Sequence, residues 1–452
     1  MIEVPRAALD ALNGADAAAR LSALEELVRS GRRGAVKDRD VNNHVHTFFS
    51  FSPYSPTAAA ERADASGLCA VGIMDHDTAA GAHEMREAGK LLGIAVTTGV
   101  ELRVSAEGTG LEGRMINNPD SPGIMYVMIH GIPERSVPMV NAFLKPVRAS
   151  RERRCRAMTE EVNGRLRGYG VDAINFREDA LAVSQYANGG TVTERHILFS
   201  AAKKIVLAAG MGDGLLLFLR DRMGIKLSGR LEGWLRDEGN PFLLYDLLGA
   251  LKSSFLPEVF IQPDGEECVH VGRAVRLAEQ AGAIPCYGYL GDVADSPTGD
   301  KKPEVFEDAY LPELFSEVKK LGFRAIAYMP PRNTMEQLRR VRGMCASHGL
   351  MEISGVDINS PRQSFNCPEI LSGEFSHLIA STWALIAHEN LANMDPRHGL
   401  FHADNPLAGL PLTEKISRYA AICASMDWTR PEEGFEQARA SLKKQGRGQA
   451  AQ

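Results

Sequence analysis

Histidine and acidic side chains recur where short apolar segments end in the N-terminal part of the chain. His44 and His46 end the segment VNNHVHT, and Asp75 and His76 end CAVGIMDHD. Glu101 lies in the next such segment, IAVTTGVELRV. A His-x-His pair in a β-strand places both imidazoles on one side of the strand, where they can chelate one metal ion while carboxylates neutralise its charge. These residue types and spacings predict a metal site.

Three more candidate ligands follow later in the sequence. His130 ends the segment GIMYVMIHG, and Asp357 and Asn359 lie in GLMEISGVDINS. In a parallel α/β barrel the carboxyl ends of all strands open onto one face, and active sites are assembled there from several strands. Residues far apart in the sequence are therefore expected to meet at one mouth.

The segments that carry these residues alternate with amphipathic stretches, which is the pattern of an α/β protein with a parallel sheet. Seven parallel strands are expected, at residues 41–47, 69–77, 94–104, 123–131, 283–292, 323–330 and 349–360. They predict a distorted (β/α)7 barrel of the TIM type, one unit short of the full eight.

Helical sequence surrounds and interrupts this barrel. We expect an N-terminal helical extension at 1–38, a barrel at 39–365 with a large helical insertion at 138–260, and a C-terminal helical extension at 366–452.

The composition is that of an ordinary globular protein. The chain has 452 residues, a formal net charge of -6, 44% hydrophobic and 24% charged residues. It has seven cysteines without a CxxC pair, which indicates a reducing compartment. It lacks both a secretory leader pattern and an apolar run long enough to span a bilayer, so we expect a cytoplasmic protein without a membrane partner. The oligomeric state stays open.

The motifs HVHT, IMDHDT and GVE, the strand-borne His130 and the late GVD resemble, in order, those of the PHP (polymerase and histidinol phosphatase) superfamily of metal-dependent phosphoesterases. The resemblance covers roughly residues 40 to 365. The Arg-rich stretch 149–171 and the segment TVTERHILFSAAKKI are similar to the insertion of the branch that contains RNA-end exonucleases and nucleoside bisphosphate phosphatases. That branch implies a further metal ligand, His196.

The resemblance implies a site with two divalent ions. One ion would be held by His44, His46, Glu101 and Asp357, and the second by Glu101, which bridges, together with His130 and His196. A bridging water, made hydroxide-like near neutral pH, would attack phosphorus. These ligands suit Mn, Zn or Fe, and the sequence does not choose among them. The catalytic candidates are Glu101, His76 and Asp75.

Two departures from the family pattern concern a third metal position. Phe51 stands where relatives often have an acidic residue, and Asn359 stands where they often have His. We therefore expect two ions, with His76 facing the substrate or supporting a ligand. At most, His76 and Asn359 would form a weak third site.

Arginine forks onto phosphate oxygens better than other side chains do, and three arginines are expected at the mouth. They are Arg195 beside His196, Arg332 in MPPRNT and Arg362 in NSPRQS, and we expect them to bind substrate. The run Arg148, Arg151, Arg153, Arg154 and Arg156 is expected to form a solvated helix face, with a nucleic-acid contact as the alternative.

The function predicted from these observations is phosphoester hydrolysis by a two-metal-activated hydroxide. A small phosphomonoester or nucleotide-like molecule is the expected substrate, and short RNA stays possible. Two alternatives remain: a metal hydrolase that cleaves a C–N or carboxyl ester bond, and a metal-binding domain without catalysis.

Overall fold

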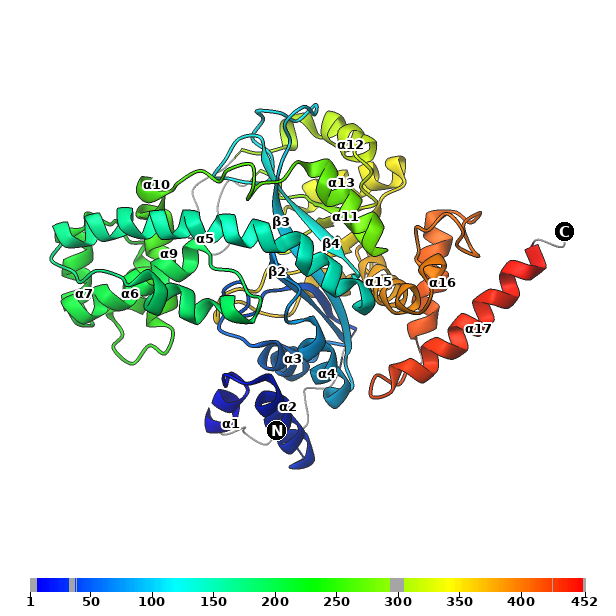
Figure 1. The fold of residues 1–452 in the computed structure, drawn as a ribbon, viewed down its shortest axis with the longest axis horizontal. Coiled ribbons are helices and arrows are strands. Elements are labelled where there is room, and N and C mark those ends of the chain that lie inside the picture. The colour runs from blue at the N-terminus through cyan, green and yellow to red at the C-terminus, as the bar shows by residue number, and fades with distance from the viewer. Residues whose placement is uncertain (1–5, 32–36, 38, 293–304, 425, 450–452) are drawn as a thin grey trace.

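The computed structural model describes residues 6–31, 37, 39–292, 305–424 and 426–449. Its centre, drawn in Figure 1, is a seven-stranded sheet. The strands neighbour one another in sequence order, from β1 to β7. The strands are β1 Val41–Val45, β2 Ala70–His76, β3 Ala95–Ser105, β4 Ile124–His130, β5 Ile284–Gly288, β6 Ala325–Tyr328 and β7 Met351–Ser354. All seven expected strands are present, and the α/β barrel prediction is confirmed.

The expectation that all seven strands run parallel is wrong for β4. This strand pairs antiparallel with β3 on one side and with β5 on the other, whereas the remaining pairs are parallel. Residues 106–123, which join β3 to β4, contain no helix. A parallel crossover needs a connection of a dozen or more residues that is usually helical, so this loop returns the chain as a hairpin instead.

The sheet curls until its last segment meets its first. The amide of His46 donates to the carbonyl of Ile358 over 2.9 Å, and the amide of Ile358 donates to the carbonyl of His44 over 3.1 Å. These bonds nearly close the barrel. They also bring the segment that carries Asp357 next to the His-x-His pair.

Helices cover the outside of the barrel. They are α3 Pro56–Ala65, α4 Ala82–Leu92, η1 Glu134–Ser136, α11 Val271–Ala281, η6 Asp308–Tyr310, α12 Leu311–Lys320, α13 Met335–His348, α14 Pro368–Leu371 and α15 His377–Met394. Their starts and ends follow local chemistry. Ser55, for example, caps α3 by accepting from the amide of Ala58, and Gly93 ends α4 in a left-handed conformation.

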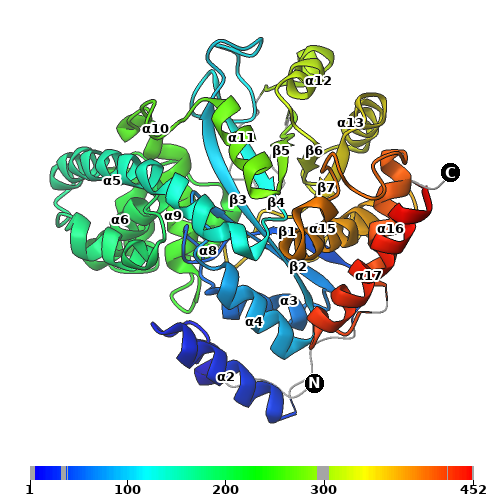
Figure 2. The same cartoon turned by 45° about the vertical axis from the view of Figure 1, so that its right-hand side comes forward.

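The insertion expected at residues 138–260 is helical. It contains α5 Val137–Gly168, η2 Phe176–Leu181, η3 Ala182–Ser184, η4 Tyr186–Asn188, α6 Glu194–Ala209, α7 Asp213–Leu217, η5 Phe218–Arg222, α8 Gly229–Arg236, α9 Leu243–Ser254 and α10 Leu256–Val259. In Figures 1 and 2 these helices form a group to one side of the barrel. The long helix α5 joins the two parts. Its residues Val140 and Leu144 pack in the barrel core, whereas Met158 and Val162 pack in the core of the insertion.

Buried charges connect the insertion to the barrel. Glu267 accepts hydrogen bonds from Arg151 Nε over 3.0 Å and from Arg154 Nε over 2.6 Å. Glu194 accepts from Arg103 of β3 over 2.6 Å and from Arg154 over 2.5 Å. All five side chains are buried. We call Arg103, Arg151, Arg154, Glu194 and Glu267 the buried ionic network.

The expected solvated face of the Arg-rich run is therefore only partly right. Arg148, Arg151 and Arg154 are buried, whereas Arg153 and Arg156 are exposed. Residues three and four apart share one side of a helix, so the three buried arginines form the face of α5 that packs on the barrel.

Shorter helical segments extend both ends of the chain. The N-terminal segment forms two helices, α1 Arg6–Ala11 and α2 Ala17–Arg29, because Asp16 caps the start of the second. Beyond α15 lie η7 Pro396–His398, α16 Leu412–Cys423 and α17 Pro431–Gln449. In the described part of the chain, no helix combines the length and apolar character that crossing a membrane requires.

The buried carboxyl group of Glu307 in the barrel should make the stability of the protein depend on pH. It is fully buried, and burial raises its pKa to about 8, although the amides of Leu290 and Gly291 donate to it and oppose the rise. A pKa raised in the folded state makes the folded protein bind more protons than the unfolded chain. The free energy of unfolding should therefore fall as pH rises from about 4.5 to about 8.

Glu307→Gln should flatten this part of the pH profile, since the amide cannot ionise. Denaturant midpoints of both proteins between pH 5 and pH 9 check the expectation. Parallel profiles for the two proteins would contradict it.

Candidate metal centre

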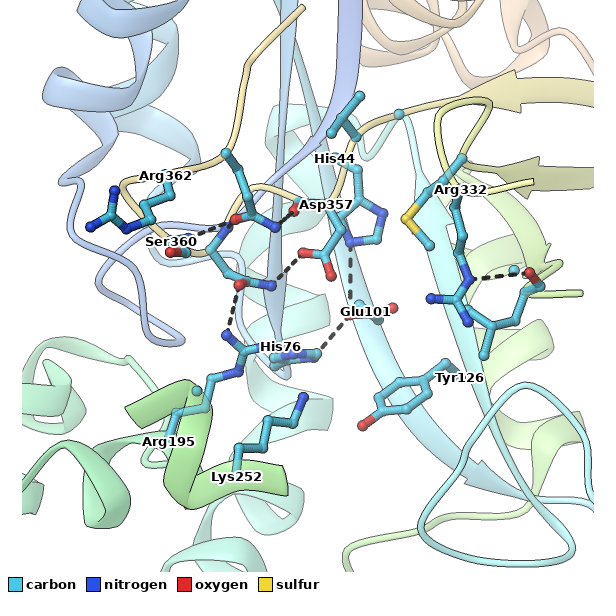
Figure 3. Close-up of a pocket in the computed structure, with 18 of the residues that line it drawn as sticks. His44, His76, Glu101, Tyr126, Arg195, Lys252, Arg332, Asp357, Ser360 and Arg362 are labelled. Carbon is cyan, nitrogen blue, oxygen red and sulfur yellow. Dashed lines mark hydrogen bonds and ion pairs between the residues drawn. The ribbon is translucent and has the colours of Figure 1, made fainter. Parts of the chain in front are cut away.

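Five side chains with metal-ligating atoms meet at the mouth of the barrel and form two overlapping groups. Four of them, His44, His76, Glu101 and Asp357, are labelled in Figure 3. The first group is His44, His46 and Asp357, and the second is His46, His76 and Glu101. Within each group the ligand atoms all lie within 4.8 Å of one another. The Nε2 atoms of His44 and His46 are 3.2 Å apart, and Asp357 Oδ1 lies 3.2 Å from His46 Nε2. Glu101 Oε2 lies 3.0 Å from His76 Nδ1.

The sheet register explains why these residues meet. His76 on β2 pairs directly with Glu101 on β3, so both side chains extend from neighbouring strands at the same level. The closing contact with Ile358 brings Asp357 beside β1. Gly355 permits this approach, because a Cβ atom at that position would lie 2.6 Å from the Cβ of His44.

Asp75 points away from the cavity, since successive residues of a strand alternate sides. Its carboxylate accepts from the amide and the hydroxyl of Thr47 and from the hydroxyl of Ser50, each over 2.6 Å. The Ser50 oxygen also lies 3.3 Å from His46 Nδ1. Because the single hydroxyl proton of Ser50 goes to Asp75, its oxygen accepts the Nδ1 proton of His46. That tautomer leaves the Nε2 lone pair of His46 directed at the cavity.

Asp75, expected to be catalytic, therefore lies outside both metal-capable groups and supports His46 through Ser50. The sequence analysis did not single out Ser50. A hydroxyl four residues after a His ligand, in the loop that follows the strand, is the signal that was available.

The charges of the site suit cation binding. Burial raises the pKa of Asp357, but when His46 Nε2 also carries a proton, its hydrogen bond and charge outweigh burial and hold that pKa well below its usual range. Burial and the neighbouring His46 lower the pKa of His76 well below its usual value. For His44, the hydrogen bond and charge of Glu101 outweigh burial and raise the pKa. The mouth thus holds an ionised aspartate beside a neutral imidazole, both of which can ligate a metal.

His130 lies deeper in the same cavity. Because β4 is antiparallel, His130 pairs with Gly99 and not with Glu101, and so it sits two residues below the level of the two groups. Its Nε2 atom is buried without a hydrogen-bond partner among the described residues. Burial lowers its pKa to about 3, so the ring is neutral at physiological pH. An unpartnered neutral imidazole fits a metal ligand, and this role of His130 stays a prediction.

His196 has a different environment from the one expected for a ligand. Its Nδ1 accepts from the amide of Thr193 over 3.0 Å, which completes a capping box at the start of α6. In a neutral imidazole that accepts at Nδ1, the proton resides on Nε2, so neither nitrogen offers a lone pair to an ion. The ring meets Phe51 edge to face at 5.0 Å. The structure does not bring His196 into either metal-capable group, and its ligand role stays a prediction.

Asn359 connects the site to the insertion. Its amide nitrogen donates to Asp357 Oδ1 over 2.7 Å, and its amide oxygen accepts from Arg195 over 2.6 Å. The oxygen that would serve a weak third metal site is therefore bound to a guanidinium. His76, the other residue considered for that site, belongs instead to the group with His46 and Glu101.

The two groups open into a cavity of about 1050 Å³ between the barrel and the insertion. Its walls include all three arginines expected to bind substrate, Arg195, Arg332 and Arg362. Figure 3 shows Arg195 and Lys252, which come from the insertion, and Arg332 and Tyr126, which come from the barrel. The sequence analysis missed Lys252, which lies on the amphipathic helix α9 without a motif around it.

The residues present fit divalent metal ions. They supply imidazole nitrogens and carboxylate oxygens in a buried cluster, and the buried Nε2 of His130 lacks a partner among the described residues. Imidazole and carboxylate together suit Zn, Fe or Mn.

A nearly closed α/β barrel whose mouth gathers imidazoles and carboxylates can hold divalent metal ions. Residues 42–182 match the family model of the PHP domain, in agreement with the resemblance of the sequence motifs to the PHP superfamily.

One curated protein is similar to part of this chain. A stretch of 153 residues is 31% identical to a 5'-3' exoribonuclease of Haemophilus influenzae and covers 34% of this chain and 47% of that protein. The chain thus matches about half the length of this curated relative.

Two solved structures are also similar to the chain. An amidohydrolase from Chromobacterium violaceum is 18% identical, with a TM-score of 0.46, over 72% of this chain and 90% of its own. A protein from Bifidobacterium adolescentis described as a metal-dependent phosphoesterase is 17% identical, with a TM-score of 0.47, over 77% of this chain and 98% of its own.

Proposed function

We propose that the protein hydrolyses a phosphomonoester or nucleotide-like phosphoester with two bound divalent ions. The observation that carries the proposal is the position of Arg195. Its guanidinium lies at the rim of the metal-capable cluster, hydrogen-bonded to the neutral Asn359, and no ion pair to a carboxylate is found for it among the described residues. A cation beside a metal cluster favours a substrate that brings negative charge of its own.

The side chains at the mouth have separate tasks in this reaction. His44, His46, His76, Glu101 and Asp357 would hold the ions, with His130 as a further ligand. When bound, such ions activate water and neutralise phosphate oxygens. Ser50 fixes the ring of His46 so that the same nitrogen always faces the cavity.

Recognition of the phosphate is assigned to Arg195 and Lys252, which line the cavity from the insertion, and to Arg332, which lines it from the barrel. Guanidinium groups bind phosphate oxygens through two parallel hydrogen bonds. The cavity volume of about 1050 Å³ accommodates a group much larger than a phosphate, such as a nucleoside. The likeness to an exoribonuclease supports a 5'-phosphorylated short RNA as a second substrate class.

The test is phosphate release from a panel of phosphomonoesters, nucleoside bisphosphates and short 5'-phosphorylated RNAs, with Mn²⁺ or Zn²⁺ supplied. His46→Ala serves as the control, because His46 belongs to both groups. Release that disappears in the control supports the proposal. A metal-loaded protein that is silent across the panel would contradict it and favour hydrolysis of a C–N or carboxyl ester bond, or metal binding without catalysis.

Arg195→Met should reduce kcat/KM for the preferred phosphoester by about 10- to 100-fold, because a hydrogen bond to a charged group contributes about 1.5–3 kcal/mol. The loss is expected mainly in KM. Arg153→Met is the matched control, since Arg153 is an exposed arginine paired with Glu266 on the outer face of α5. Equal kinetics for the two variants would remove Arg195 from substrate binding.

A further inference from the structure

Arg362 lines the cavity, but its guanidinium already has partners on the insertion. Its Nε donates to Asp246 Oδ1 over 2.6 Å, and its Nη2 donates to Asp246 Oδ2 over 2.8 Å and to Asn240 over 3.1 Å. The guanidinium also lies 4.0 Å from the ring centroid of Trp234 and 5.2 Å from that of Phe242. A bidentate pair stacked on an aromatic ring is a specific geometry that lysine cannot reproduce.

The loop that begins at Asp357 and includes Arg362 is stiffened from within. The side-chain oxygen of Gln363 accepts from the amides of Asn359 and Ser360, each over 2.7 Å. The side-chain nitrogen of Gln363 donates to the carbonyl of Asp357 over 2.6 Å. These bonds tie residues 357–363 into one hydrogen-bonded loop, with a candidate metal ligand at one end and Arg362 near the other.

We propose that Arg362 is a positioning residue: by clamping loop 357–363 to Asp246 of the insertion, it holds the Asp357 carboxylate where a metal ion needs it. The sequence-based prediction placed Arg362 on the substrate instead. This inference rests on one part of the proposed function, the binding of a metal ion, and does not depend on the substrate. It also gives the insertion a second role, because helices α8 and α9 then help to build the metal centre as well as the cavity wall.

The direct test is Mn²⁺ binding to the full-length chain, freed of metal with a chelator and titrated by calorimetry. Arg362→Met and Asp246→Asn should each weaken Mn²⁺ binding by about tenfold or more, the usual effect of removing a group that orients a metal ligand. The double variant should be no weaker than either single variant, because both changes break the same clamp. Asp246→Asn is isosteric, so it tests the clamp even if Arg362→Met misfolds.

A matched control exists on the outside of the barrel. Arg339 makes the same bidentate contact with Glu374, over 2.7 and 3.0 Å, on the exposed face of α13. Arg339→Met should leave Mn²⁺ affinity within about twofold of the unmodified protein. Arg362→Lys should behave like Arg362→Met, since a lysine cannot form the fork.

Three outcomes separate the possibilities. Unchanged Mn²⁺ affinity in Arg362→Met, with a raised KM for substrate, would overturn the inference and return Arg362 to substrate binding. If Arg362→Met reduced Mn²⁺ affinity no more than Arg339→Met does, the inference would also be overturned. A third outcome is that the unmodified chain binds Mn²⁺ but releases no phosphate, while Arg362→Met and Asp246→Asn bind Mn²⁺ more weakly. This outcome would overturn the proposed function and support the clamp.

Discussion

Glu101→Gln is expected to abolish metal binding and activity together. The Glu101 carboxylate lies 3.0 Å from His76 and 3.8 Å from both His44 and His46, so it contacts ligands of both groups. The amide keeps the shape of the side chain but loses its negative charge and half of its acceptor capacity. Removal of groups that only support a ligand costs 10- to 100-fold, so loss of this carboxylate should weaken Mn²⁺ binding and kcat/KM by at least about 100-fold.

Glu107→Gln is the control for this substitution. Glu107 is exposed in the loop that follows β3, a few residues beyond the same strand. Calorimetric titration with Mn²⁺ and phosphate release should both match the unmodified protein in this variant. If Glu101→Gln retained metal and activity as well, Glu101 could not be a ligand, and the bridging role expected from the sequence would be excluded.

Glu267→Gln should lower the free energy of unfolding by about 3–5 kcal/mol. Glu267 is 1% exposed and pairs with Arg151 and Arg154, which are buried with it. Removing one partner of a buried ion pair leaves the other charges uncompensated, which costs far more than the pair itself contributes. The denaturant midpoint, followed by circular dichroism, measures the loss.

The neighbouring residue provides the control for Glu267→Gln. Glu266 is 72% exposed and pairs with the exposed Arg153, so Glu266→Gln should change stability by less than about 1 kcal/mol. The arginines hold the pKa of Glu267 below its usual range. The ionised carboxylate therefore stabilises the folded protein at pH values above the usual pKa of a glutamate. As pH falls below that value, the free energies of unfolding of Glu267→Gln and the unmodified protein should become more similar. If Glu267→Gln and Glu266→Gln lowered the free energy of unfolding equally, the buried ionic network would have no special role in stability.

The strands and the cluster at the mouth were predictable because their signals are local. An apolar segment that ends in His, Asp or Glu predicts both a β-strand and the end of that strand at which the site lies. His44, His46 and Asp357 lie in one metal-capable group and Glu101 lies in the other, with His46 and His76. Their roles as ligands stay a prediction. The register of a parallel sheet then aligns strand ends without further information.

The features that the sequence did not reveal depend on contacts between distant segments. The direction of β4 was predicted wrongly, although the helix-free connection at 106–123 was a usable sign of a hairpin. The capping contact of His196 with Thr193 is decided by the ring's orientation, which spacing alone does not specify. Arg362 has the expected place but different partners, because Asp246 lies more than a hundred residues away in the chain.

The shared helix α5 has a consequence for how the protein folds. Its 32 residues span about 48 Å, and one half belongs to the barrel core while the other belongs to the insertion core. Because α5 supplies side chains to both cores, displacement of one half of the helix removes packing partners from the core on that side and disturbs the helix that the other core uses. The stabilities of the insertion and the barrel are therefore expected to be coupled through α5.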